Sequence, residues 1–167
     1  RRRLPLQGRR FMMMAGSLSR KGYLASKSYG VAKGQDTLLY KAGEGLVAFI
    51  RSGRLGQVRT GAASGIATRF MARKDASRLA CIGTGHQAET QILAVAQARA
   101  LESIHVYGRD ALKRKAFAEK MSALLGQEVR PVDSPAAAVQ GRDIVVTMTN
   151  SVGPVFDGKL LEAGTHI

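Results

Sequence analysis

Apolar residues in the second half of the chain alternate between strand-like runs and helical spacing. Residues 79–82 form a short apolar run, and a second one covers residues 104–107. Between them Ala88, Ile92 and Val95 recur at helical spacing, with Ala96 completing the stripe. A strand, a helix and a second strand within about thirty residues match the size of a βαβ crossover.

The alternation continues to the end of the chain. A helix is predicted over residues 110–125, ending at Gly126, and a strand over residues 129–132. Ser134 and Pro135 then predict the start of a short helix, and residues 143–149 form the most strand-like run of the sequence. The inward face expected for the longer helix consists of Phe117, Met121, Leu124 and Leu125. Strands that alternate with helices predict the α/β class, with a Rossmann-type, doubly wound parallel sheet.

The first part of the chain has a different pattern. Short strand-like runs at residues 22–29, 37–40 and 46–50 predict an antiparallel sheet whose last two strands form a hairpin. A helix is expected over residues 56–73, and its apolar side consists of Ala62, Ala63, Ile66, Ala67, Phe70 and Met71. The two patterns predict an α+β region at residues 1–74 and an α/β region at residues 75–167.

Residues 61–65 of that predicted helix are all small. A glycine within a helix costs about 1 kcal/mol relative to alanine. A close approach by another backbone or by a bound ligand would explain them equally well.

The turn between the first strand and helix of the βαβ unit has the form G-x-G-x-x-A. In this pattern Gly83 permits the sharp turn, Gly85 lets a pyrophosphate approach the backbone, and small Ala88 lets helix and strand pack closely. The intervening residues complete the predicted phosphate site: Thr84, His86 and Gln87. Free N–H groups at the helix start favour an anion there. The spacing therefore predicts dinucleotide binding.

A polar loop, residues 149–154, leaves the carboxyl end of the last strand. In a doubly wound sheet this loop and the glycine turn open onto one crevice. Thr149 and Ser151 are candidates to hold a ribose or nicotinamide, and an ordinary polar turn is the alternative.

Charge adds one candidate feature. The chain has 167 residues with 26 basic and 12 acidic ones, a net charge of +14, which raises nucleic acid as a partner. Much of this charge lies in two clusters, one within residues 1–10 and one made of Arg109, Lys113, Arg114 and Lys115. Neither is interleaved with aromatic residues, so nucleic acid is a less favoured prediction. A solvated helix face is the alternative for the second cluster. Arg109 and Lys113 follow the second strand of the βαβ unit, where they suit a 2′-phosphate and favour NADP(H). Asp110 keeps NAD(H) possible.

Other classes are disfavoured. The longest apolar runs have about five residues, far short of a membrane-spanning helix. No spacing of His, Cys or carboxylate residues indicates a metal site. Cys81 is the single cysteine, which favours a reducing compartment, and a cytoplasmic location is expected.

The run RTGAASG at residues 59–65, the turn GTGHQA and the later DIVVTMTNSVGP resemble the ornithine cyclodeaminase and mu-crystallin family. The resemblance covers nearly the whole chain. It implies NAD(P)-dependent enzymes that act on amino acids or cyclic imines, typically as homodimers. It also implies that residues 1–74 are part of a substrate-binding and dimerisation domain, and that residues 75–167 are a truncated NAD(P)-binding Rossmann domain.

The resemblance also implies site residues. Arg59 falls on the family's substrate-carboxylate arginine, Lys27 on a substrate-contacting lysine and Thr60 on a phosphate contact. A further substrate arginine corresponds to Arg1 or Arg3. The family's catalytic aspartate would lie beyond Ile167, so the sequence is interpreted as a fragment, and its three histidines do not replace that aspartate.

The sequence thus predicts an ornithine cyclodeaminase-like enzyme that converts a small α-amino acid, ornithine to proline with loss of ammonia, or reduces the related cyclic imine. Two alternatives stay open. One is a mu-crystallin-like NADPH-binding protein without catalysis, and the less favoured one is a basic nucleic-acid-binding module.

Overall fold

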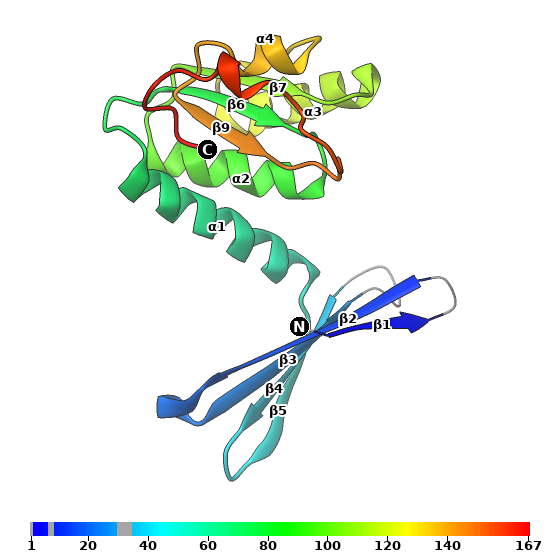
Figure 1. Cartoon of the computed structure of the whole chain (residues 1–167). Coiled ribbons are helices and arrows are strands. Elements are labelled where there is room, and N and C mark those ends of the chain that lie inside the picture. Colours follow the sequence, from blue (N-terminus) through cyan, green and yellow to red (C-terminus); the bar gives the residue numbers. More distant parts are fainter. Residues whose placement is uncertain (1, 7–8, 30–34) are drawn as a thin grey trace. The chain divides into compact units, whose positions relative to one another are not determined.

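A computed structural model describes residues 2–6, 9–29 and 35–167. The chain divides into two compact units, Arg1–Gly56 and Gln57–Ile167. The long helix α1 (Gly53–Met71) begins just before this division (Figure 1). A domain boundary near residue 74 remains a prediction.

The first unit is an antiparallel sheet in which each strand pairs with the next one along the chain. Its strands are β1 (Arg2–Leu6), β2 (Arg9–Leu18), β3 (Tyr23–Tyr29), β4 (Gln35–Lys41) and β5 (Gly45–Arg51). The predicted hairpin is confirmed, because β4 and β5 pair antiparallel through a turn in which Gly43 and Gly45 both have φ of 80°. The pattern analysis missed β1 and β2. These strands are held by backbone hydrogen bonds, and their sequences show no alternation of apolar and polar residues from which a strand could be predicted.

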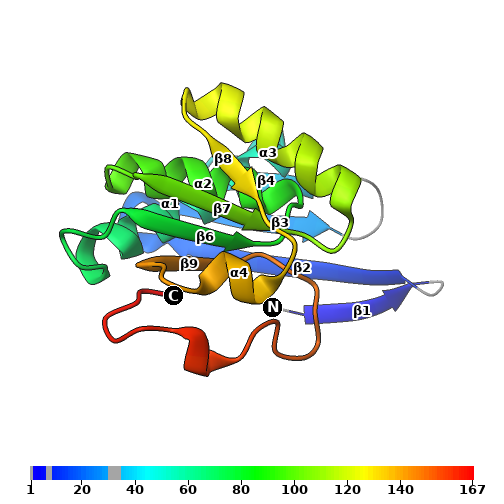
Figure 2. The same cartoon turned by 90° about the horizontal axis from the view of Figure 1, so that it is seen from above.

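The second unit contains a parallel four-stranded sheet in the order β8-β7-β6-β9 (Figure 2). Its strands are β6 (Arg78–Ile82), β7 (Ser103–Tyr107), β8 (Val129–Pro131) and β9 (Ile144–Thr147). The helices are α2 (His86–Ala98), α3 (Ala111–Leu125) and α4 (Pro135–Val139). The predicted α/β class and parallel sheet are therefore confirmed.

Alternating residues of β6 explain why helices cover both faces. Leu79 and Cys81 are buried with α2 and α3 on one face. Ala80 and Ile82 are buried with α4 on the other face (Figure 1). A strand that is apolar on both sides requires this arrangement, because each face must be shielded from water.

The strand order places a switch point beside β6. The chain runs from β6 outward to β7 and β8, and then returns to β9 on the opposite side of β6. The carboxyl ends of β6, β7 and β9 consequently meet at one edge, where doubly wound sheets bind their ligands.

Helix α1 packs through its small residues. A Cβ atom at Gly61 would collide with the carbonyl of Thr90, and one at Gly65 would lie 2.8 Å from the carbonyl oxygen of Ala94. Another backbone, that of α2, is therefore what approaches the small residues. The apolar side noted in the sequence is turned outward, since Phe70 is 79% exposed and Met71 73%.

The inward face predicted for α3 is only partly right. Met121 is fully buried, and Phe117 and Leu125 pack against the same core. Leu124 is 52% exposed, so its predicted inward position is wrong. The buried stripe instead runs through Arg114, Ala118 and Met121, positions i, i+4 and i+7 of one helix face.

The amino ends of β6 and β9 are joined by one carboxylate. Buried Asp143 accepts hydrogen bonds from the backbone N–H groups of Ser77 (3.1 Å) and Arg78 (2.9 Å). The Arg78 guanidinium donates Nε and Nη2 at 3.0 and 2.8 Å, and Arg73 donates Nη2 at 2.5 Å. The hydrogen bonds from Arg78 hold the pKa of Asp143 well below its usual range.

Candidate functional site

The turn after β6 requires glycine at its first position. Gly83 has φ of +115°, and its N–H donates to the carbonyl of Tyr107 at 2.7 Å. A Cβ atom at this position would collide with the backbone carbonyl of Met148. The turn therefore lies between the ends of the neighbouring strands β7 and β9, and there is no room for a side chain at position 83.

Cys81 supports the same turn from inside the sheet. Its Sγ donates to the carbonyl of Gly83 at 3.4 Å, and the residue is fully buried. Burial raises the pKa of its thiol to about 12. Cys81 therefore remains protonated and acts as a packed donor in the strand.

Helix α2 starts at the second glycine of the motif. Gly85 is its N-cap residue, has φ of −88°, and contributes no side-chain cap. Apart from Gly85 itself and its two neighbours in the chain, no heavy atom of the described residues lies within 4 Å of the position its Cβ would take. The N–H groups of the first helical turn, at His86 and Gln87, have no partner within the helix. Together with the helix dipole they form a site for an anion such as a pyrophosphate.

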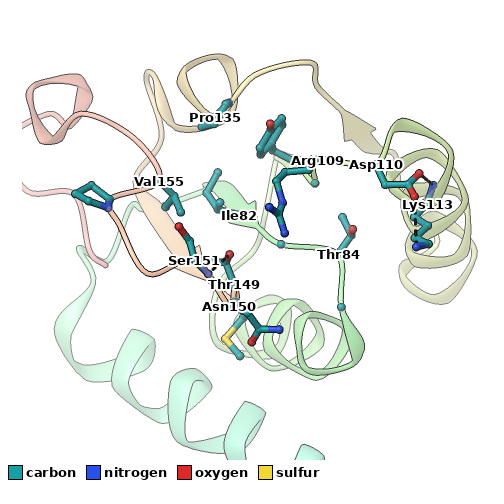
Figure 3. Close-up of a pocket in the computed structure, with 16 residues that line it drawn as sticks. Ile82, Thr84, Arg109, Asp110, Lys113, Pro135, Thr149, Asn150, Ser151 and Val155 are labelled. Atoms are coloured by element: carbon teal, nitrogen blue, oxygen red, sulfur yellow. Dashed lines mark hydrogen bonds and ion pairs between the residues drawn. The ribbon is translucent and has the colours of Figure 1, made fainter.

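A pocket of about 440 Å³ opens at this edge of the sheet (Figure 3). It is lined from the carboxyl ends of β6, β7 and β9, with contributions from α3 and α4. The lining residues are Ile82, Gly83, Thr84, Gly85, Tyr107, Gly108, Arg109, Asp110, Lys113, Pro135, Met148, Thr149, Asn150, Ser151, Pro154 and Val155. Of the cofactor residues chosen from the sequence, all but Thr60, His86 and Gln87 line this pocket.

The loop after β7 carries the pocket's charges. Arg109 is exposed and lines the pocket beside Lys113. Asp110 caps α3, because its Oδ1 accepts from the N–H of Lys113 at 3.0 Å. Its Oδ2 lies 3.3 Å from Lys113 Nζ. The backbone hydrogen bond from Lys113 is the largest cause of the lowered pKa of Asp110. The carboxylate is therefore charged and already engaged on both oxygens.

The loop after β9 forms the opposite wall of the pocket. Thr149 Oγ1 accepts from the N–H of Ser151 at 3.1 Å, and Ser151 Oγ donates to the carbonyl of Gly153 at 2.9 Å. These hydroxyls fix the loop, and Asn150 lies between them along the chain with its amide at the pocket (Figure 3). The predicted polar loop thus faces the glycine turn across one crevice.

Helix α1 is tied to the start of α2 by buried polar groups. Gln57 donates its Nε2 to the carbonyl of His86. Thr90 Oγ1 donates to the carbonyls of Gln57 at 3.0 Å and Gln87 at 3.2 Å. Two residues further along α1 lies exposed Arg59, whose Nη2 donates to Thr60 Oγ1 at 3.2 Å. Arg59 and Thr60 therefore lie on a helix whose position relative to the start of α2 is fixed by these hydrogen bonds.

The remaining predicted substrate residues lie in the first unit. Lys27 is half-buried on β3, with its Nζ 5.6 Å from the ring centroid of Tyr29. The same Nζ would lie 3.0 Å from a Cβ atom at Gly56, in the first turns of α1. Arg1 lies outside the described residues.

Pro135 and Arg114 are among the residues near the pocket that the sequence analysis did not assign to the site. Pro135 lines it from the start of α4. Arg114 is buried beneath the loop after β7, and it was considered only as part of a basic cluster. Its position on the buried stripe of α3 is the signal that could have found it, because an arginine among core positions needs buried partners.

Among the described residues, no group of three or more His, Cys, Asp or Glu side chains is placed to hold a metal ion. No helix among them is long and apolar enough to cross a membrane.

Comparison with known proteins identifies the family. The model of the ornithine cyclodeaminase/mu-crystallin family matches residues 20–167. The chain belongs to this family. Within it, the chain is 38% identical over 128 residues to a Delta(1)-pyrroline-2-carboxylate reductase of Bacillus cereus, an alignment covering 77% of this chain and 39% of the relative.

Two solved structures of similar sequence have the same fold. The Thermococcus litoralis Delta(1)-pyrroline-2-carboxylate reductase, in complex with NADH and L-proline, superposes with a TM-score of 0.82 at 29% identity, covering 93% of this chain and 56% of that one. A probable ornithine cyclodeaminase from Bordetella pertussis gives 0.87 at 26% identity, covering 98% and 53%. This chain spans about two fifths of the curated relative and a little over half of each solved chain.

Proposed function

We propose that this chain is the cofactor-binding part, with some of the substrate-binding part, of an NAD(P)-dependent enzyme that reduces a small cyclic imine carboxylate. The pocket at the carboxyl ends of β6, β7 and β9 is the observation on which the proposal rests. Reductases of this substrate class are among the chain's relatives, one of them solved with NADH and L-proline. Cyclodeamination of ornithine to proline is the second candidate, and the B. pertussis likeness supports it.

The chain's own residues suit a dinucleotide. The open space beside Gly85 allows a pyrophosphate to reach the N–H groups of His86 and Gln87. Thr84 and the loop at Thr149 and Ser151 provide hydroxyls on the two sides of the pocket for ribose or carboxamide groups. When bound, the nicotinamide supplies the hydride.

Of the two coenzymes, we propose NADP(H) as the preferred one. Enzymes that prefer NAD use a carboxylate after the second strand to accept the ribose hydroxyls. Here Asp110 is committed to capping α3 and to the ion pair with Lys113. Arg109 instead presents an exposed guanidinium at the pocket, and Lys113 adds a second cation there next to its Asp110 partner, which suits the three oxygens of a 2′-phosphate.

The substrate would be held by its carboxylate. Arg59 corresponds to the family's substrate arginine, and a guanidinium grips a carboxylate in two places. Lys27 and Arg1 are proposed as further substrate contacts, and Thr60 as a phosphate contact. These residues would orient the imine carbon and neutralise the charge on its carboxylate. A homodimer is the proposed assembly of the complete protein.

An assay of the complete gene product tests the proposal. We expect Delta(1)-pyrroline-2-carboxylate with NADPH to cause loss of the reduced-nicotinamide absorbance, with a higher kcat/KM than with NADH. Ammonia release from L-ornithine with NAD(P) would favour cyclodeamination instead. Coenzyme binding without turnover of either substrate would support the non-catalytic, mu-crystallin-like alternative and contradict the proposed activity.

A further inference from the structure

Arg114 lies on the buried face of α3, outside the pocket but directly beneath its charged wall. The residue is 8% exposed and shares its helix face with Ala118 and Met121. It is not among the residues that line the pocket. Burying an arginine costs free energy unless its donors are satisfied, so its partners indicate what it does.

Three partners surround the Arg114 guanidinium. Nη1 donates to the carbonyl of Gly108 at 2.8 Å, and Nη2 donates to Asp133. The guanidinium carbon also lies 5.7 Å from the ring centroid of Tyr107, within the range of a cation–π contact. Two of these partners, Tyr107 and Gly108, are the residues immediately before Arg109.

The same short segment is held from its other side. Gly108 is buried, and a Cβ atom there would lie 2.5 Å from Thr84 Oγ1 and 3.1 Å from Thr84 Cγ2. The backbone after β7 therefore lies between Thr84, in the turn after β6, and the guanidinium of Arg114. Little freedom remains for the direction in which the chain leaves Gly108.

We propose that Arg114 is a positioning residue for coenzyme discrimination, because it fixes the Tyr107–Gly108 backbone so that Arg109 faces the 2′-phosphate of NADP(H). The inference rests on the proposed function, since it requires a dinucleotide in the pocket. Arg114 itself does not touch the phosphate. It determines the position from which Arg109 reaches the phosphate. Lys113 reaches the same phosphate from the adjoining first turn of α3.

This role differs measurably from a purely structural one. A structural arginine would, when replaced, weaken NADPH and NADH binding by the same factor. A positioning arginine changes their ratio, because only NADPH carries the 2′-phosphate. Its effect should also depend on Arg109, since that side chain carries the discrimination.

The experiment measures dissociation constants of NADPH and NADH for the complete gene product and for its Arg114→Met, Arg114→Lys and Lys115→Met variants, using the fluorescence of the reduced nicotinamide. Lys115 is exposed on the same helix, so Lys115→Met removes an equal charge from the neighbouring position. We expect Arg114→Met to weaken NADPH about tenfold and NADH less than about twofold. Arg114→Lys should be intermediate, and Lys115→Met close to the unsubstituted chain.

A double substitution completes the test. With Arg109→Ala already present, Arg114→Met should leave the NADPH to NADH ratio unchanged, because its effect is transmitted through Arg109. An unchanged ratio in the single Arg114 variants would overturn the inference while leaving coenzyme binding intact. If Arg114→Met does not fold, the Arg114→Lys ratio decides. If the unsubstituted chain binds neither coenzyme, the proposed function itself fails, and this inference with it.

Discussion

The two ends of the parallel sheet differ in how their polar groups are satisfied. At the amino end, Asp143 is 4% exposed and receives hydrogen bonds from two backbone N–H groups and two guanidinium groups. At the carboxyl end, the first turn of α2 starts at an uncapped glycine, and Arg109 and Lys113 are exposed. One end satisfies its polar groups internally, and the other leaves donors for a ligand. Substitutions at the two ends should therefore separate stability from coenzyme binding.

Gly83→Ala is expected to have the largest effect, and it is the one position where the two properties fail together. Its Cβ would meet the Met148 carbonyl at a φ of +115°. We expect the free energy of unfolding to fall by about 3 kcal/mol, from strain and overpacking combined, and coenzyme binding to be lost. Urea denaturation and calorimetric titration measure the two. Unchanged values of both would contradict the close approach of β9 to the turn.

Asp143→Ala should reduce stability alone. Removing the carboxylate leaves Arg73, Arg78 and the N–H of Ser77 without their shared acceptor. We expect a loss of about 3 kcal/mol in the free energy of unfolding. In the folded protein the dissociation constant for NADPH should stay within about twofold, because the pocket is at the other end of the sheet. A much weaker NADPH affinity in a fully folded sample would remove the distinction between the two ends.

The same carboxylate predicts the acid sensitivity of the fold. Its pKa is lowered in the folded state, so the unfolded chain binds a proton first as pH falls. Its stabilisation is complete above the ordinary aspartate pKa of about 4 and is lost progressively below it. Thermal melts from neutral pH to pH 3 should show a steeper decline for the unsubstituted chain than for Asp143→Asn. If the melting temperatures of the two proteins decline equally as pH falls, groups other than Asp143 cause the loss of stability in acid.

Gly85→Ala should affect binding alone and is the matched control for Gly83→Ala. Gly85 has ordinary backbone angles, and its Cβ would project into open space. We expect the melting temperature to be unchanged and NADPH and NADH to bind on the order of tenfold more weakly, because the methyl group occupies the approach of the pyrophosphate. Normal affinity for both would place the diphosphate elsewhere.

Arg109→Ala should have the narrowest effect. We expect NADPH binding to weaken about tenfold, as for loss of one charge-assisted hydrogen bond, with NADH binding and stability unchanged. Titrations of the two coenzymes side by side measure this. Equal weakening of both would assign Arg109 to the shared diphosphate.

Sequence reasoning succeeded where local chemistry determines the structure. The glycines of the turn, the strand at residues 79–82 and the cap at Ser134 each follow from steric and hydrogen-bonding rules that act within a few residues. Sequence reasoning predicted seven of the sixteen residues that line the pocket, because they follow the ends of strands that could be recognised from the sequence.

What the sequence did not show depends on contacts between distant segments. The outward turn of Phe70 on α1 follows from the fit of Gly61 and Gly65 against α2, which no periodicity reveals. Arg114 was placed with the surface charges because its partners, Gly108 and Asp133, lie on other segments. Strand β1 contains Pro5 and two arginines, so its pairing with β2 was not evident.

Backbone amide shifts on addition of NADPH test the central claim most directly, since that claim places the coenzyme's diphosphate on the first turn of α2. In a two-dimensional 15N–1H NMR titration, we predict the largest shifts at Gly83, Gly85, His86 and Gln87, with smaller ones at Arg109. The amides of Ser77 and Arg78, at the other end of the sheet, should not move. Saturable NADPH binding with no shift at residues 83–88, or no binding at all, would contradict the account.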